Sequence, residues 1–99
     1  MKQTRKRRIL IVDDSEMNRE ILTGILEDEY DIVEAEDGKK AIAIMEEGLY
    51  SFSIVLLDIT MPELDGFGVL QVMQQRNWLK ELPVIIISAE TSKEYIGHA

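Results

Sequence analysis

Cysteine is absent from the 99 residues, which excludes disulfide bonds and thiolate metal sites. Long apolar runs are absent too: the longest are four or five residues, against the roughly 20 that a membrane-spanning helix requires. Residues 1–8 are basic, but the four apolar residues that follow are too few for the apolar region of a signal peptide. We therefore expect a cytoplasmic protein with no membrane partner.

Several motifs of enzymes and nucleotide-binding proteins are also missing. The sequence has no internal repeat, no low-complexity tract and neither a GxGxxG nor a Walker loop, which argues against nucleotide binding. Its one histidine, His98, has no second histidine or carboxylate pair near it, so we give it little weight as a ligand or catalyst. The apolar fraction of 45% is ordinary for a globular protein, and the length allows one domain at most.

Positive charge is scarce outside the first eight residues. They hold five of the eleven Lys and Arg residues, whereas residues 9–99 carry six basic and nineteen acidic residues. A basic arm could touch nucleic acid. We instead expect residues 1–7 to be a flexible, solvated lead-in, because the acidic body that follows would repel phosphate groups everywhere except at a metal site. Direct nucleic-acid binding is therefore not expected.

Carboxylates follow two of the apolar runs at the point where each run ends. Residues 9–12 lead into Asp13 and Asp14, and residues 54–57 lead into Asp58. Uninterrupted apolar runs are typical of parallel strands buried on both faces, whose carboxyl ends share the edge of the sheet where ligands bind. Two like charges 4 Å apart repel by about 1 kcal/mol in water and about 4 kcal/mol at an effective dielectric constant near 20. A lone aspartate there is usually a cap or turn residue, but three that converge favour a bound hard cation such as Mg²⁺.

The remaining patterns predict strands that alternate with helices. The strands are expected at about residues 8–12, 31–35, 52–57 and 84–87, the last as a buried strand. Ser15 and Asp37 are the expected N-caps of the first two helices, and Gly48 is the expected C-cap of the second. Core packing is the default expectation for the apolar stripe of the first helix, which consists of Met17, Ile21 and Ile25. Strands and helices in this alternation, with short connections, predict an α/β fold with a parallel sheet.

Together these motifs resemble the receiver domain of two-component response regulators. The resemblance covers the whole chain and rests on the order and spacing of five motifs: Asp13-Asp14, Asp58, Met61-Pro62, Asp65-Gly66 and Ser88-Ala89. It implies a flavodoxin-like, doubly wound parallel sheet. This chain is expected to hold the strand order 2-1-3-4, with the fifth strand and the fifth helix of the family missing.

The resemblance also implies a role for each polar residue at the carboxyl edge. Asp58 would be the phosphoacceptor for a sensor histidine kinase. Mg²⁺ would be held by Asp13, Asp14 and Asp58 together with the backbone carbonyl of Thr60, and its charge would let an anionic phosphoryl group approach. The Ser88 hydroxyl would bind a phosphoryl oxygen and draw its loop toward the site, as a conformational switch. Such a protein is not a metabolic enzyme, since it catalyses only its own phosphorylation and dephosphorylation.

Further consequences follow from the resemblance. Thr60 and Glu90 stand where family members tune dephosphorylation, but no lysine is assigned to the position after the fifth strand. The expected division is a lead-in at 1–7 and an incomplete receiver domain at 8–99. Without a fifth strand, the apolar edge at 84–87 would be unpaired, and we expect self-association through that edge or by exchange of elements. Without a fifth helix, part of the apolar face of the first helix would be bared, a patch that favours partner binding or aggregation.

Three functions compete at this point. The first is a phosphorylatable signalling module, and the second is a receiver fragment that no longer switches and acts in self-association or partner binding. The third is a small Mg²⁺-dependent phosphohydrolase similar to the haloacid dehalogenases, with Asp58 as the nucleophile. Such an enzyme needs a second aspartate two residues after the nucleophile, where Thr60 stands. An EF-hand between Asp58 and Asp65 is excluded because Glu63 holds the position that requires glycine.

Overall fold

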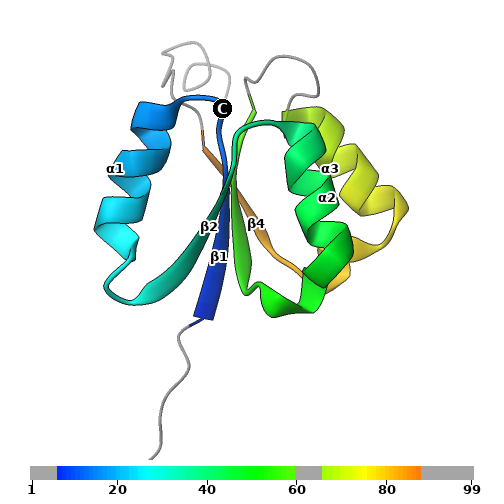
Figure 1. Cartoon of the computed structure of the whole chain (residues 1–99). Helices are drawn as coiled ribbons and strands as arrows, with labels where there is room; N and C mark the ends of the chain where they lie inside the picture. The colour runs from blue at the N-terminus through cyan, green and yellow to red at the C-terminus, as the bar shows by residue number, and fades with distance from the viewer. Residues whose placement is uncertain (1–6, 60–65, 88–99) are drawn as a thin grey trace, which may run out of the picture.

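The computed structural model describes residues 7–59 and 66–87, in which four strands form one sheet with helices on both faces (Figure 1). The strands are β1 (Arg7–Val12), β2 (Tyr30–Ala35), β3 (Ile54–Asp58) and β4 (Val84–Ile87). Their order is β2-β1-β3-β4, and every neighbouring pair is parallel. The predicted α/β fold and its strand order 2-1-3-4 are confirmed.

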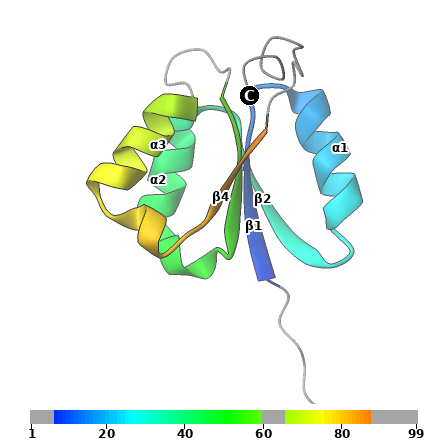
Figure 2. The same cartoon turned by 180° about the vertical axis from the view of Figure 1, so that it is seen from behind.

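The helices are divided between the two faces of the sheet. Helix α1 (Glu16–Leu26) covers one face, and α2 (Gly38–Gly48) and α3 (Gly66–Gln75) cover the other, as Figure 2 shows from behind. Two short 3₁₀ helices, η1 (Leu49–Ser51) and η2 (Trp78–Lys80), connect α2 to β3 and α3 to β4. Among the described residues there is no helix with both the length and the apolar content that crossing a bilayer demands.

The main core lies between the sheet and the α2–α3 face. Leu10 and Leu57 of the central strands are fully buried there, together with Met45 of α2 and Met73 of α3. Ile11, on the other face of β1, is fully buried as well. Burial on both faces is the reason that β1 reads as an unbroken apolar run in the sequence.

Side-chain caps begin the first two helices. The Ser15 hydroxyl accepts a hydrogen bond from the backbone N–H of Asn18 at 3.2 Å, and the Asp37 carboxylate accepts one from Lys40 at 2.8 Å. Each cap satisfies a backbone donor that has no partner within its helix. Both predicted N-caps are confirmed, and both lie in loops at the carboxyl edge of the sheet.

The predicted C-cap at Gly48 is wrong. Gly48 is the last residue of α2, and the C-cap is Leu49, whose backbone is right-handed. A left-handed glycine is not needed because the chain continues directly into η1. There the Ser51 hydroxyl donates a hydrogen bond to the Gly48 carbonyl at 2.7 Å.

The default core position of the stripe on α1 is wrong, whereas the expected exposure of part of this helix's apolar face is confirmed. Met17, Ile21 and Ile25 are 68%, 53% and 69% exposed, whereas Leu22 and Leu26 are half-buried. Helix α1 packs mainly against β1 and β2, and no other helix among the described residues lies on this face of the sheet (Figure 2). The stripe therefore faces solvent, although its spacing is that of a buried helix face.

Strand β4 is only partly buried. Its prediction as a buried strand is wrong, whereas the described residues agree with the expectation of an apolar edge at 84–87. Ile85 and Ile86 are each 48% exposed. Within the described residues, β4 pairs with β3 alone and forms the edge of the sheet. The predicted division into a lead-in at 1–7 and a receiver domain at 8–99 stays a prediction, since residues 1–6 lie outside the described part of the chain. Strand β1 itself begins at Arg7.

Gly66 allows α3 to begin directly against the end of β3. A Cβ atom at this buried position would lie 2.4 Å from the carbonyl oxygen of Asp58 and 2.4 Å from the Cα of Ile59. Both neighbours are backbone atoms, which cannot rotate away as the end of a side chain can. A side chain larger than hydrogen must therefore displace either α3 or the strand end that carries Asp58.

We expect Gly66→Ala to lower the free energy of unfolding by about 2 kcal/mol, the usual scale of overpacking in a well-packed site. Gly24 in α1 is the matched control, because a Cβ there meets nothing within 4 Å. Gly24→Ala should raise stability by about 0.5–1 kcal/mol, the helix-propensity difference between alanine and glycine. Urea denaturation measures both variants, and equal stability of the two would contradict the close approach at Gly66.

Candidate functional site

Three carboxylates meet at the carboxyl edge of the sheet. Asp13 and Asp14 follow β1, Asp58 ends β3, and each offers a carboxylate oxygen such that these atoms all lie within 4.8 Å of one another. Asp13 and Asp58 are 1% exposed, whereas Asp14 is exposed. The convergence predicted from the two apolar runs is therefore present, with two buried carboxylates and one that opens to solvent.

The pairing of β1 with β3 produces this convergence. Val12 and Leu57 are partners in the parallel register, so the residues that follow them, Asp13 and Asp58, lie side by side at the end of the two strands. Adjacent strands lie about 4.8 Å apart. The side chains of Asp13 and Asp58 therefore cannot separate unless the pairing of the two strands is broken.

Asp13 is held by the first turns of α1. Its two carboxylate oxygens accept hydrogen bonds from the backbone N–H of Ser15 at 2.9 Å and from the side-chain amide of Asn18 at 3.5 Å. Its backbone N–H donates to the Ala35 carbonyl of β2 at 3.1 Å. The guanidinium of Arg19 donates to its backbone carbonyl at 2.6 Å. Donors at the N-terminus of a helix favour negative charge, so α1 partly offsets the acidity of this loop.

Electrostatic conflict remains in spite of these donors. Burial raises the pKa of Asp13 above the ordinary aspartate value of 3.8, and the Asp58 carboxylate raises it further by charge repulsion and a side-chain hydrogen bond. The hydrogen bonds from Ser15 and Asn18 act in the opposite direction, but they do not cancel the rise in pKa. A buried carboxyl group whose pKa is raised in this way favours a nearby cation when it is ionised.

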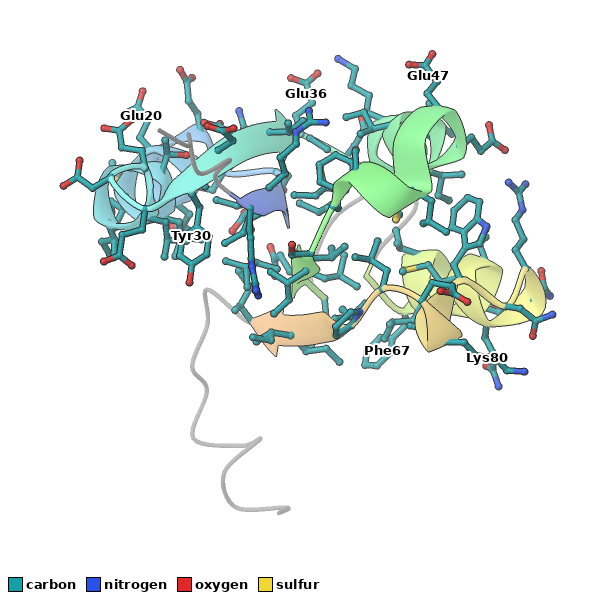
Figure 3. The ribbon with its side chains drawn as sticks, turned by 90° about the horizontal axis from the view of Figure 1, so that it is seen from below. Glu20, Tyr30, Glu36, Glu47, Phe67 and Lys80 are labelled. Carbon is teal, nitrogen blue, oxygen red and sulfur yellow. The ribbon has the colours of Figure 1, made fainter. Side chains whose placement is uncertain are left out.

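The donor set fits a hard divalent cation. It consists of oxygen only, it carries up to three negative charges, and its exposed member, Asp14, leaves an approach from solvent. Magnesium is typically bound by one or two carboxylates together with water and phosphate oxygens. No other acidic side chains in the described part of the chain form such a set: Glu20, Glu36 and Glu47, for example, are exposed and point away from the sheet (Figure 3).

The other predicted site residues lie outside the described part of the chain. They are Thr60, Ser88 and Glu90, and their roles stay predictions. Ile59 and Ile87, the described residues that precede Thr60 and Ser88, are hydrogen-bonded to each other: the Ile59 N–H donates to the Ile87 carbonyl at 3.4 Å. The pairing of β3 with β4 thus continues to the carboxyl edge, on the opposite side of β3 from β1.

Sequence reasoning missed the residues that hold Asp13 in place. Asn18 and Arg19 fall within the expected first helix, and its apolar pattern assigns them no role, yet both reach back to Asp13. One signal was available: Arg19 is the single basic residue of α1, whose other charged residues are Glu16 and Glu20. A lone cation one turn after an acidic pair predicts a contact with that loop.

Comparisons with known proteins agree with the geometry. The model of the response regulator receiver domain family matches residues 9–99. The two-component response regulator ORR5 of rice (Oryza sativa) is 32% identical over 83 residues, which make up 83% of this chain and 61% of that protein. The chain thus spans less than two thirds of the length of this relative.

Solved structures show the same arrangement. The chemotaxis response regulator CheY4 of Vibrio cholerae superposes with a TM-score of 0.79 at 28% identity, over 92% of this chain and 75% of that one. The response regulator TrrA of Thermotoga maritima, in complex with Mg²⁺-BeF, gives a TM-score of 0.76 at 34% identity, over 86% of this chain and 71% of that one. The chain belongs to the family of response regulator receiver domains of two-component systems.

Proposed function

We propose that this chain is a phosphoacceptor module, in which Asp58 receives a phosphoryl group from the phosphohistidine of a sensor histidine kinase. A carboxylate oxygen of Asp58 forms the new bond to phosphorus while the bond between phosphorus and the histidine nitrogen breaks, and that nitrogen regains a proton. The observation that carries the proposal is the placement of Asp58, buried at the sheet edge with oxygens of Asp13 and Asp14 within 4.8 Å of its own. Membership in the receiver family supports the same role.

The acidic cluster would hold Mg²⁺ through Asp13, Asp14 and Asp58, with the backbone carbonyl of Thr60 as a further ligand. The bound ion supplies positive charge that offsets the carboxylates and the incoming phosphoryl oxygens. The structure of TrrA with Mg²⁺-BeF supports the choice of metal by similarity.

The protein's own residues contribute mainly by orientation. Asp58 ends a strand that is hydrogen-bonded on both sides, to β1 and to β4, so its backbone cannot turn away from an incoming group. Gly66 keeps the first turn of α3 against the peptide after Asp58. Such rigid placement of a nucleophile lowers the entropy that the reaction itself must lose.

Other roles come from the resemblance. The Ser88 hydroxyl would donate a hydrogen bond to a phosphoryl oxygen and shift its loop, and Thr60 and Glu90 would border the water that removes the phosphoryl group. The module would catalyse only its own phosphorylation and dephosphorylation, and it would meet its kinase in the cytoplasm.

A second candidate is a receiver that does not switch and instead associates with another copy. The observation in its favour is the apolar edge strand β4, with Ile85 and Ile86 each 48% exposed. Light scattering over a range of protein concentrations tests it. A monodisperse monomer at high concentration would contradict association, whereas a dimer abolished by Ile86→Lys would support it.

Phosphorylation is tested directly by incubating the chain with a small-molecule phosphodonor and recording intact mass. We expect an adduct of one phosphoryl group that requires Mg²⁺ and is lost in Asp58→Asn, because an amide is not a nucleophile here. Asp31→Asn, which changes an exposed aspartate of β2, is the matched control and should be phosphorylated like the wild type. An adduct that persists in Asp58→Asn would place the acceptor elsewhere.

Stability should report on the same cluster. Because the folded-state pKa of Asp13 lies above 3.8, the unfolded chain releases this proton at lower pH than the folded chain. Without metal, the contribution of Asp13 to stability is therefore lost as pH rises from about 3.8 through the folded-state pKa. A cation bound to the folded state alone would restore stability in proportion to its concentration.

Asp13→Asn should raise the free energy of unfolding at pH 7 in EDTA by on the order of 1 kcal/mol, the scale of one relieved like-charge pair. The same variant should lose the stabilisation that millimolar Mg²⁺ gives to the wild type. Thermal unfolding with EDTA and with Mg²⁺ measures both effects, again with Asp31→Asn as the control. Destabilisation of Asp13→Asn in EDTA would show that its hydrogen bonds outweigh the repulsion.

A further inference from the structure

We propose that Arg19 is a positioning residue for the acidic cluster, because it clamps the peptide bond between Asp13 and Asp14 to the edge strand β2. The inference rests on the proposed function, in which these two aspartates are ligands of Mg²⁺. It adds a residue outside the ligand set whose task is to fix the direction in which the ligands point.

The clamp consists of two hydrogen bonds from one guanidinium. Nη1 of Arg19 donates to the backbone carbonyl oxygen of Asp13 at 2.6 Å, and Nε donates to Oε1 of Glu34 at 2.9 Å. The carbonyl belongs to the peptide unit that continues into Asp14, so its orientation governs where the next side chain leaves the backbone. The Arg19 side chain is only 11% exposed, which limits its rotamers and makes the contact persistent.

Glu34 is itself anchored, which makes it a fixed point. Its second oxygen, Oε2, accepts a hydrogen bond from the Thr23 hydroxyl at 2.9 Å. Its backbone belongs to β2, in register with Ile11 of β1. Arg19 therefore connects the loop after β1 to a strand and to a second position on α1, and the loop cannot shift without breaking this network.

Arg19 acts on the cluster by orienting the Asp13 carbonyl and not by neutralising the carboxylates, because its charge is already balanced by Glu34. A planar guanidinium presents its donors at fixed angles, so it defines the position of two acceptors at once. The ion pair between Arg76 and Glu46 is different: both side chains are more than two-fifths exposed, and they join the residue that follows α3 to α2 on the other face of the sheet. That pair provides a matched control for the loss of an arginine ion pair.

The loop offers a reporter that needs no metal. The backbone N–H of Ser15 donates to Oδ1 of Asp13 at 2.9 Å. If Arg19 releases the Asp13 carbonyl, the peptide unit can rotate and this hydrogen bond weakens. The backbone N–H of Ala41, which donates to the Asp37 carbonyl at 3.1 Å at the start of α2, serves as an internal reference.

The first measurement is Mg²⁺ affinity by calorimetry in wild type, Arg19→Met and Arg76→Met. Methionine keeps the apolar stem of arginine and removes its donors. We expect about a tenfold loss of affinity in Arg19→Met, at the lower end of the effect of residues that orient metal ligands. Arg76→Met should bind Mg²⁺ within twofold of the wild type even where its thermal midpoint falls.

The second measurement is amide hydrogen exchange without metal. Protection of the Ser15 amide should fall about tenfold in Arg19→Met and stay unchanged in Arg76→Met, with the Ala41 amide constant in both. Arg19→Lys is the variant of choice if Arg19→Met does not fold. A lysine can reach one of the two acceptors but not both at the fixed angles, so we expect an intermediate loss of Mg²⁺ affinity.

Different results separate the inference from the proposed function. Unchanged Mg²⁺ affinity in the Arg19 variants, or an equal loss in Arg76→Met, would overturn positioning by Arg19. Unchanged protection of the Ser15 amide would overturn it as well, since the loop would not depend on the clamp. A wild-type chain that binds no Mg²⁺ and accepts no phosphoryl group would instead overturn the proposed function, and the inference would fall with it.

Discussion

The parallel pairing of β1 with β3 is the constraint on which the site depends. Its register makes Val12 and Leu57 partners, and the next residue on each strand is an aspartate. Backbone hydrogen bonds hold neighbouring strands about 4.8 Å apart. Asp13 and Asp58 are therefore forced together by the sheet, whatever their charges prefer, and the rest of the site compensates for this proximity.

Compensation comes from the start of α1. The N-terminus of α1 directs the Ser15 N–H and the Asn18 amide at the two oxygens of Asp13. These donors are neutral, and burial with the nearby Asp58 still raises the pKa of Asp13. A buried, acidic site of this kind favours the binding of a cation, and the bound cation in turn favours the approach of a phosphoryl group. The same carboxylates lower the stability of the metal-free fold.

Most of the fold could be predicted because its signals are local. Unbroken apolar runs predicted the bounds of β1 and β4 to within one residue. A serine and an aspartate just before the expected helices predicted the N-caps Ser15 and Asp37, and both make the cap hydrogen bond. The carboxylate cluster followed from a general property of parallel sheets, whose carboxyl ends share one edge. The C-cap at Gly48 was predicted wrongly because a glycine is also tolerated as the last residue of a helix that runs on into a 3₁₀ turn.

The amino-acid sequence alone predicted the strands, their parallel pairing and the acidic cluster, since each follows from periodicity, from the alternation of strands with helices or from residues adjacent in the chain. The strand order was predicted only through the resemblance to receiver domains. Which apolar residues are buried depends on the tertiary structure: the stripe of Met17, Ile21 and Ile25 has helical spacing, but spacing does not say whether another element lies against it. The tertiary structure also brought Arg19 between Asp13 and Glu34. That contact joins residues 15 positions apart in the sequence, and it exists because parallel pairing sets β2 beside β1 while α1 crosses over both.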